Sequence, residues 1–265
     1  LVETPPSDAT FSEIFKLTSK HYADVFLICG WEFNTMELNG TLSMHTADMK
    51  PFSVLIVEGV RMDLTETVEK KLHDNGMYVF DYSLVNKGSY LVINYEMLIS
   101  QILSEWEIAS HREELVLQTM EKVEKAVNLE AELLINLREM YNLPLKHLQL
   151  QVSSMITELK HILLREIRLH DSCGELFASA MQAVKQEAIP RTVLRLADDR
   201  IDDLPLKTKQ ELIATILSSR YIYYNGLLPM LLGDNHAIDQ GFAKLVFKYF
   251  EERMETNEVA IDDTC

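Results

Sequence analysis

Four acidic residues stand close together at Asp198-Asp199-Arg200-Ile201-Asp202-Asp203, and they are the sharpest chemical pattern in this 265-residue sequence. The run contains the spacing DDxxD, which on a helix brings Asp198, Asp199 and Asp202 towards one face. Carboxylates placed in this way can ligate a hard cation such as Mg²⁺. No second acidic metal motif follows, so an exposed acidic loop, closed by Leu204-Pro205, is the simpler interpretation. A divalent-metal-dependent enzyme that uses these three aspartates is kept as an alternative hypothesis.

Patterns typical of other catalytic sites do not occur in the sequence. The eight histidines never form HxxxH or HExxH, there is no GxSxG motif, and no glycine-rich phosphate-binding pattern is present. Cys29, Cys173 and Cys265 are too widely spaced for a CxxC pattern, and their odd number gives no disulfide framework. We therefore predict no catalytic residue, no bound cofactor and a reducing compartment, and the sequence favours a protein that is not an enzyme.

The net charge and the hydropathy of the chain limit the classes of partner that it can bind. The formal net charge is −16, whereas a nucleic-acid-binding protein needs a basic patch for the phosphate backbone. No apolar run reaches the length of about 18 residues that spans a bilayer. We expect no nucleic acid partner, no membrane insertion and an intracellular location, in the cytoplasm or the nucleus.

The first 96 residues have the pattern of a small β-rich α+β head. Asn39-Gly40 and Asn86-Lys87-Gly88 each separate two alternating or apolar runs, which is typical of β-hairpins. A helix is predicted at 65–73, with Asn75-Gly76 as its stop signal. The predicted strands occupy the following runs: 24–29, 41–45, 52–57, 77–82 and 89–95. Because the turns are hairpins, we expect a mostly antiparallel sheet.

Residues 97–255 have the pattern of an elongated helical bundle. From Ile99 to Tyr141 apolar residues recur at alternating steps of three and four, which predicts one helix of roughly 65 Å. Pro144 ends it, and a second stripe from Leu145 to Leu169 predicts a long antiparallel helical hairpin. Capping boxes are predicted at Ser172 with Glu175 and at Thr208 with Glu211, before two further helices. A last helix is expected at 237–254, and residues 256–265 are expected to be a flexible tail.

Apolar residues outside these stripes make the helical faces wider than a two-stranded coiled coil requires. Leu115, Leu133, Leu150 and Leu163 belong to this surplus and are the candidate partner-binding residues. The leading hypothesis is a protein–protein interaction or scaffold module, part of a larger assembly, that binds other protein chains or a second copy of itself. A regulatory module that encloses a small apolar ligand is the remaining alternative.

Overall fold

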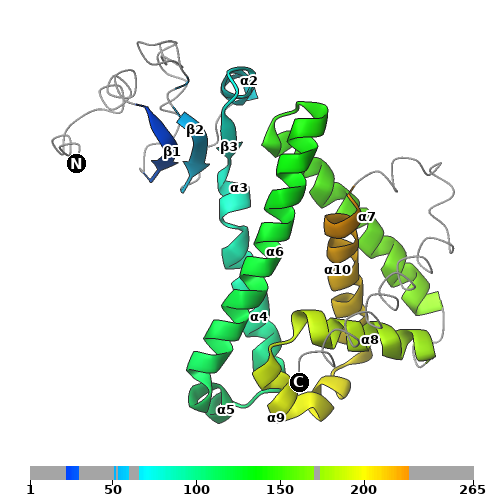
Figure 1. Ribbon diagram of the computed structural model, residues 1–265. Helices are drawn as coiled ribbons and strands as arrows, with labels where there is room; N and C mark the ends of the chain where they lie inside the picture. Colours follow the sequence, from blue (N-terminus) through cyan, green and yellow to red (C-terminus); the bar gives the residue numbers. More distant parts are fainter. Residues whose placement is uncertain (1–21, 30–50, 52, 60–65, 170–173, 227–265) are drawn as a thin grey trace, which may run out of the picture. The chain divides into compact units, whose positions relative to one another are not determined.

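The computed structural model describes residues 22–29, 51, 53–59, 66–169 and 174–226 (Figure 1). The chain separates into two compact units. The described residues within Leu1–Gly88 and Leu134–Leu150 form the first unit, and those within Ser89–Leu133 and Gln151–Cys265 form the second. The first unit thus combines most of the predicted head with the connection between the two longest helices.

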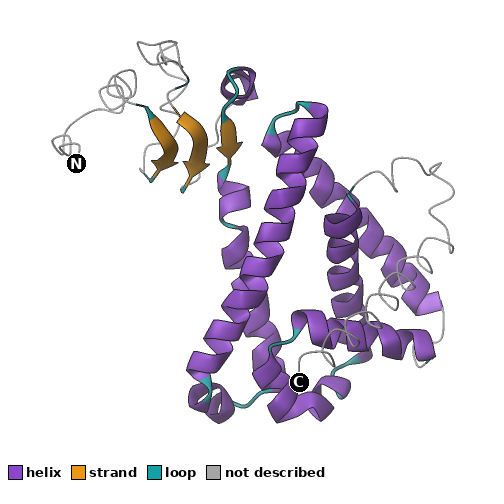
Figure 2. Cartoon of the chain, in the orientation of Figure 1, coloured by secondary structure: helices purple, strands orange, loops and turns teal. Residues whose placement is uncertain are grey.

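A three-stranded parallel sheet forms one part of the first unit. Its strands are β1 (Ala23–Ile28), β2 (Ser53–Glu58) and β3 (Tyr78–Phe80), hydrogen-bonded in the order β1-β2-β3. Val25 pairs with Leu55 across β1 and β2, and Leu55 pairs with Tyr78 across β2 and β3. The three arrows point the same way in Figure 2.

The prediction of a mostly antiparallel sheet was therefore wrong. Helix α2 (Glu66–Asp74) lies between β2 and β3 in the chain and packs against β3. A helical crossover returns the chain to the starting edge of the sheet, so that the next strand runs parallel to the last. The predicted hairpin at Asn39-Gly40 lies outside the described residues.

Helix α2 ends at the predicted stop signal. Gly76 has a φ of 80°, a left-handed conformation that favours glycine. The Met77 N–H donates to the Leu72 carbonyl at 3.1 Å, and the Gly76 N–H donates to the His73 carbonyl at 2.8 Å. This pair of bonds is a Schellman motif, which satisfies carbonyl groups left free at the helix end.

The second predicted hairpin is also wrong, because its second strand is helical. After the short helix α3 (Tyr82–Val85), residues Lys87–Ile102 form the helix α4. Ile99 and Ile102 are buried at a spacing of three residues, which a helix permits and alternation along a strand does not. The β-branched and aromatic residues at 89–95 favour a strand only weakly, since packing regularly overrides propensity.

The predicted single long helix is broken twice. Helix α4 ends at Ile102, α5 spans Glu105–Ser110, and α6 spans Arg112–Tyr141. Ser104 begins α5 with a capping box: the Glu107 carboxylate accepts from the Ser104 N–H at 2.8 Å, and the Ser104 hydroxyl accepts from the Glu107 N–H. This local start signal at 104–107 interrupts a periodic stripe that would otherwise predict one helix.

The two longest helices and their three-residue connection are present as the sequence predicts. Helix α7 spans Leu145–Leu169, and Asn142 in the connection has a φ of 51°. The chain turns back on itself at this point in Figure 1. Asparagine tolerates the left-handed region better than most residues.

Three more helices follow, and the last of them begins without the capping box predicted for it. They are α8 (Glu175–Ala188), α9 (Arg191–Asp202) and α10 (Leu206–Asn225). Gly174 and Pro205 precede α8 and α10, and neither provides a side-chain hydrogen bond to cap its helix. Ser172 and the predicted helix at 237–254 lie outside the described residues. The overall class is mostly helical, with a small parallel sheet followed by the eight helices α3 to α10.

Each unit has its own buried apolar core. In the first unit it contains Ile56, Leu72, Met77, Leu84, Leu134, Leu137, Leu145 and Leu148. In the second unit α8 packs against α10, and the core contains Val123, Val152, Leu159, Val184, Ile189, Val193, Ile201, Ile213, Leu217 and Ile222. None of the helices in the described part of the chain has the length and apolarity needed to cross a membrane.

Candidate functional site

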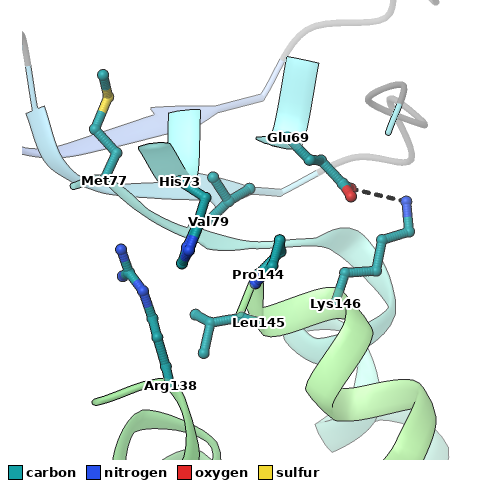
Figure 3. A pocket seen from close by; sticks show the side chains of 8 residues that line it. All are labelled: Glu69, His73, Met77, Val79, Arg138, Pro144, Leu145 and Lys146. Carbon is teal, nitrogen blue, oxygen red and sulfur yellow. Dashed lines mark hydrogen bonds and ion pairs between the residues drawn. The ribbon is translucent and has the colours of Figure 1, made fainter. Parts of the chain in front are cut away.

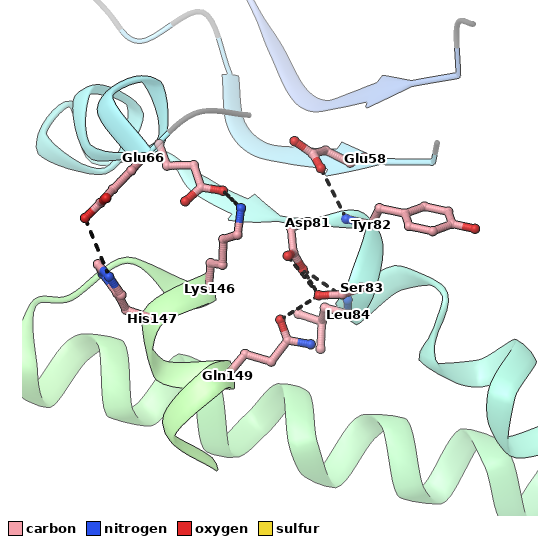
Figure 4. A network of polar contacts seen from close by, with 10 residues as sticks. Glu58, Glu66, Asp81, Tyr82, Ser83, Leu84, Lys146, His147 and Gln149 are labelled. Carbon is pink, nitrogen blue, oxygen red and sulfur yellow. Dashed lines mark hydrogen bonds and ion pairs between the residues drawn. The ribbon is translucent and has the colours of Figure 1, made fainter. Parts of the chain in front are cut away.

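Polar side chains gather where β2 and β3 end. Glu58 is the last residue of β2, and Asp81 directly follows β3. Parallel strands place their carboxyl ends at one edge of a sheet, which is where ligands of open α/β sheets bind. Helix α7 brings Lys146, His147 and Gln149 to the same neighbourhood (Figure 4).

Glu58 is an unusual residue for a strand end because its side chain is almost fully buried. Its exposed fraction is 2%. Its Oε2 accepts from the Tyr82 N–H at 3.2 Å, while its Oε1 is buried and has no hydrogen-bond partner in the part of the chain that the structure describes. Burial raises the pKa of Glu58 to about 7, the Tyr82 N–H opposes this rise, and the charge of Asp81 adds to it.

Asp81 connects the sheet edge to α3 and α7. Its Oδ1 accepts from the Leu84 N–H at 3.0 Å, so Asp81 is the N-cap of α3. The Ser83 hydroxyl lies 2.8 Å from Oδ2 of Asp81 and 3.2 Å from the amide oxygen of Gln149. The hydroxyl has one proton, which the shorter distance assigns to Asp81.

One ion pair and one surface contact between a histidine and a glutamate join α2 to the start of α7. Lys146 Nζ lies 2.8 Å from Oε1 of Glu69, whose side chain is only 9% exposed, and His147 lies 3.9 Å from Glu66 at the surface. The inner pair is the stronger one, because a buried charge-assisted hydrogen bond is less screened by water. Together these contacts hold the strand ends, α2 and the start of α7 in one arrangement.

The chemical capacity of this edge rests on Glu58. A carboxyl group that titrates near neutral pH can give or take a proton under physiological conditions, which is the requirement for a general acid or base. The described residues contain no group of three or more His, Cys, Asp or Glu side chains that could hold a metal ion. Cys29, which follows β1, is exposed as a free thiol.

The predicted acidic loop is helical. Asp198, Asp199 and Asp202 all lie in α9, just after a kink at Ala197, where φ is −156° and ψ is 39°. Lys185 Nζ from α8 stands between two of these carboxylates, 2.9 Å from Oδ1 of Asp198 and 2.9 Å from Oδ1 of Asp202. A protein ammonium group thus occupies the position between Asp198 and Asp202.

The four candidate partner-binding leucines lie in different environments. Leu115, Leu133 and Leu163 are buried, whereas Leu150 on α7 is 62% exposed. The buried three contribute to packing within the chain.

Glu58, Asp81 and Arg138 were not identified from the sequence as candidate site residues. Arg138 lies in the last turn of α6. The available signal was the position of polar residues directly after apolar strand runs, as in Val57-Glu58-Gly59 and Phe80-Asp81. That signal identifies a site only when the strands are known to be parallel.

Distant relatives of the chain are found among glutamate dehydrogenases. The NAD-specific glutamate dehydrogenase of Saccharomyces cerevisiae is 24% identical over 236 residues, which cover 82% of this chain and 21% of that protein. Glutamate dehydrogenase 2 of Dictyostelium discoideum is 23% identical, over 83% of this chain and 22% of its own length. A probable NAD-specific glutamate dehydrogenase of Schizosaccharomyces pombe is 21% identical, over 79% of this chain and 20% of its own length.

These matches are partial. No protein-family model matches the chain. No solved structure matches it significantly. The chain spans about a fifth of the length of the curated relatives it matches. It therefore has distant, partial homology to one region of large NAD-specific glutamate dehydrogenases.

Proposed function

We propose that this chain is a non-catalytic docking module of a glutamate dehydrogenase-like polypeptide or assembly. The observation that carries the proposal is the extent of the similarity, which covers about four fifths of this chain but only about a fifth of each relative. No two of the nine glycines are separated by a single residue. The chain therefore contains no GxGxxG fingerprint of the kind that binds a dinucleotide.

The docking surface is a group of apolar residues on α6, which we name the α6 patch: Val116, Leu117 and Met120. Their exposed fractions are 55%, 62% and 50%. Leu115, on the same helix, is buried instead. The heptad stripe predicted from the sequence includes Val116 and Met120, so the part of the stripe that should pack against another helix is open to solvent. Large exposed apolar groups next to one another are typical of protein interaction sites.

The surroundings of the patch indicate the chemistry of its partner. Glu113, Glu121 and Glu124 are exposed on the same stretch of α6. A complementary surface is a helix with apolar residues at heptad spacing and lysine or arginine beside them. We assign this helix to another segment of the dehydrogenase-like polypeptide.

The test compares two variants of the tagged chain in extracts of its source organism. In the first, Val116→Glu and Met120→Glu place charges in the α6 patch; in the second, Leu150→Glu changes an equally exposed leucine elsewhere. Bound proteins are identified by mass spectrometry, and affinity is then measured with the purified partner. We expect a glutamate dehydrogenase polypeptide to bind the wild type and Leu150→Glu, and to bind the double variant at least tenfold more weakly.

Three results would contradict the proposal. They are the absence of any glutamate dehydrogenase polypeptide among the bound proteins, equal affinity of the double variant and the wild type, and NAD-dependent oxidation of glutamate by the purified chain alone. The last result would leave docking possible but would show that the module is catalytic.

A further inference from the structure

Arg138, in the last turn of α6, carries a buried positive charge that has no counter-ion among the residues that the structure describes. The residue is 7% exposed. Among the residues that the structure describes, no carboxylate pairs with its guanidinium group, and Nη1 is buried without a hydrogen-bond acceptor. Its one described side-chain interaction is with the ring of Tyr78, whose centroid lies 3.5 Å from Cζ. A buried arginine is normally paired, because leaving such a charge alone costs several kcal/mol.

The Tyr78 ring and the helix end account for part of this burial. A cation over an aromatic face is attracted to it, and a positive charge near the carboxyl end of a helix is favoured by the helix dipole. Neither contact gives the N–H groups of Arg138 an acceptor. A guanidinium group offers five N–H donors in a planar fork that fits the two oxygens of a carboxylate.

Arg138 lines a small pocket whose eight residues all belong to the first unit (Figure 3). The other lining residues are Glu69, His73, Met77, Val79, Pro144, Leu145 and Lys146. Lys146 is already paired with Glu69 at 2.8 Å, and Nε2 of His73 lies 3.0 Å from the Asn142 carbonyl oxygen. The charge of Arg138 is thus the uncompensated one among the described residues of this pocket.

We propose that this pocket binds the carboxylate group of a small organic acid, which accepts hydrogen bonds from Arg138. A single uncompensated cation matches a monoanion, and Glu69 would repel a phosphate dianion. The walls formed by Met77, Val79 and Leu145 are apolar and suit a short hydrocarbon group. The part of the pocket that a water-sized group can enter has a volume of about 10 Å³. The whole empty space at the pocket has a volume of about 270 Å³, which includes open solvent. The ligand is therefore small or keeps its tail outside.

The test measures binding of acetate and propionate to the full 265-residue chain by calorimetry and by the shift in thermal unfolding midpoint, with ionic strength held constant by chloride. Arg138→Met removes the charge and keeps a long apolar side chain next to Tyr78. Lys70→Met is the matched control, because Lys70 is an exposed cation of the same unit that pairs with Asp74. We expect wild type and Lys70→Met to bind both acids at millimolar concentration and Arg138→Met to bind at least tenfold more weakly.

Phosphate serves as the competing probe. Three results would each overturn the proposal. The first is that neither acetate nor propionate binds at a ligand concentration of about 50 mM, which is 50 times the expected dissociation constant of about 1 mM. The others are equal binding by Arg138→Met and wild type, and tighter binding of phosphate than of acetate. If Arg138→Met does not fold, Arg138→Lys replaces it, since lysine keeps the charge but loses the fork. That variant is also expected to bind acetate more weakly, and unchanged affinity would contradict the assignment.

Discussion

The Tyr223 hydroxyl on α10 donates a 2.6 Å hydrogen bond to Oε2 of Glu130 on α6, ninety-three residues earlier in the chain. Glu130 is fully buried. In the sequence it interrupts the apolar stripe of α6, and its partner explains why a carboxylate is tolerated there. A buried acidic group needs a donor, and a tyrosine hydroxyl supplies one from a neighbouring helix. Burial beside Glu130 raises the pKa of Tyr223, so the hydroxyl keeps its proton.

Tyr223→Phe removes this donor and leaves the rest of the aromatic ring in place. We expect the free energy of unfolding to fall by about 1–3 kcal/mol, the cost of a buried acceptor that has lost a hydrogen bond. Urea denaturation of the variant and the wild type measures the difference. Tyr90→Phe is the control, because Tyr90 is 61% exposed and its hydroxyl can bond to water. Equal losses in both variants would contradict a special role for the pair.

Two local signals in the sequence predicted helix ends correctly. The stop at Asn75-Gly76 and the connection at 142–144 depend on backbone preferences of a few residues, and both are present. The heptad stripe from Ile99 to Tyr141 predicted one helix, but the Ser104 capping box breaks it. Periodicity describes which residues could share a face, whereas capping decides where a helix starts.

The parallel sheet and the site at its edge could not be predicted in the same way. The direction of β3 depends on the crossover through α2. The sequence pattern at Asn86-Lys87-Gly88 is typical of a hairpin turn, and it therefore favoured an antiparallel sheet. Arg138 appears in the sequence as an ordinary cation at a helix end. Its burial against Tyr78 arises from residues sixty positions apart, which no local pattern records.

Lys185 and the acidic residues of α9 allow a sharp test of the predicted metal site. The Lys185 side chain is 8% exposed, while those of Asp198 and Asp202 are 57% and 61% exposed. Either carboxylate alone can still pair with the ammonium group. We expect Asp198→Asn and Asp202→Asn to have small effects singly, and the double variant to lose about 1 kcal/mol more than their sum, because it leaves a buried lysine unpaired.

The same unfolding assay is used for a control variant and for measurements with added metal ions. Asp199→Asn changes a neighbouring aspartate that does not contact Lys185, and its stability should match that of the wild type. Because Lys185 occupies the position between Asp198 and Asp202, we expect no shift in the thermal midpoint with Mg²⁺ or Mn²⁺. Additive effects of the two asparagine substitutions would show that the carboxylates do not share Lys185, and a rise in midpoint with either ion would support the metal site instead.

Glu58→Gln should change the pH dependence of stability. The pKa of Glu58 is raised from 4.5 to about 7 in the folded chain, so the folded state holds this proton more tightly than the unfolded state does. Below about pH 4.5 the group is protonated in both states and carries no cost. As the pH rises from 4.5 to 7 the unfolded state ionises first, and stability falls by about 3 kcal/mol in total before levelling off above pH 7.

The glutamine variant is neutral at every pH and can still accept the Tyr82 N–H through its amide oxygen. We therefore expect it to be more stable than the wild type at pH 8, by up to about 3 kcal/mol, with the difference vanishing near pH 4.5. Urea denaturation across this range measures it, with Glu124→Gln as the control for an exposed glutamate. A difference that is constant from pH 4.5 to 8 would mean that Glu58 does not titrate near neutrality, and would remove it as a candidate acid or base.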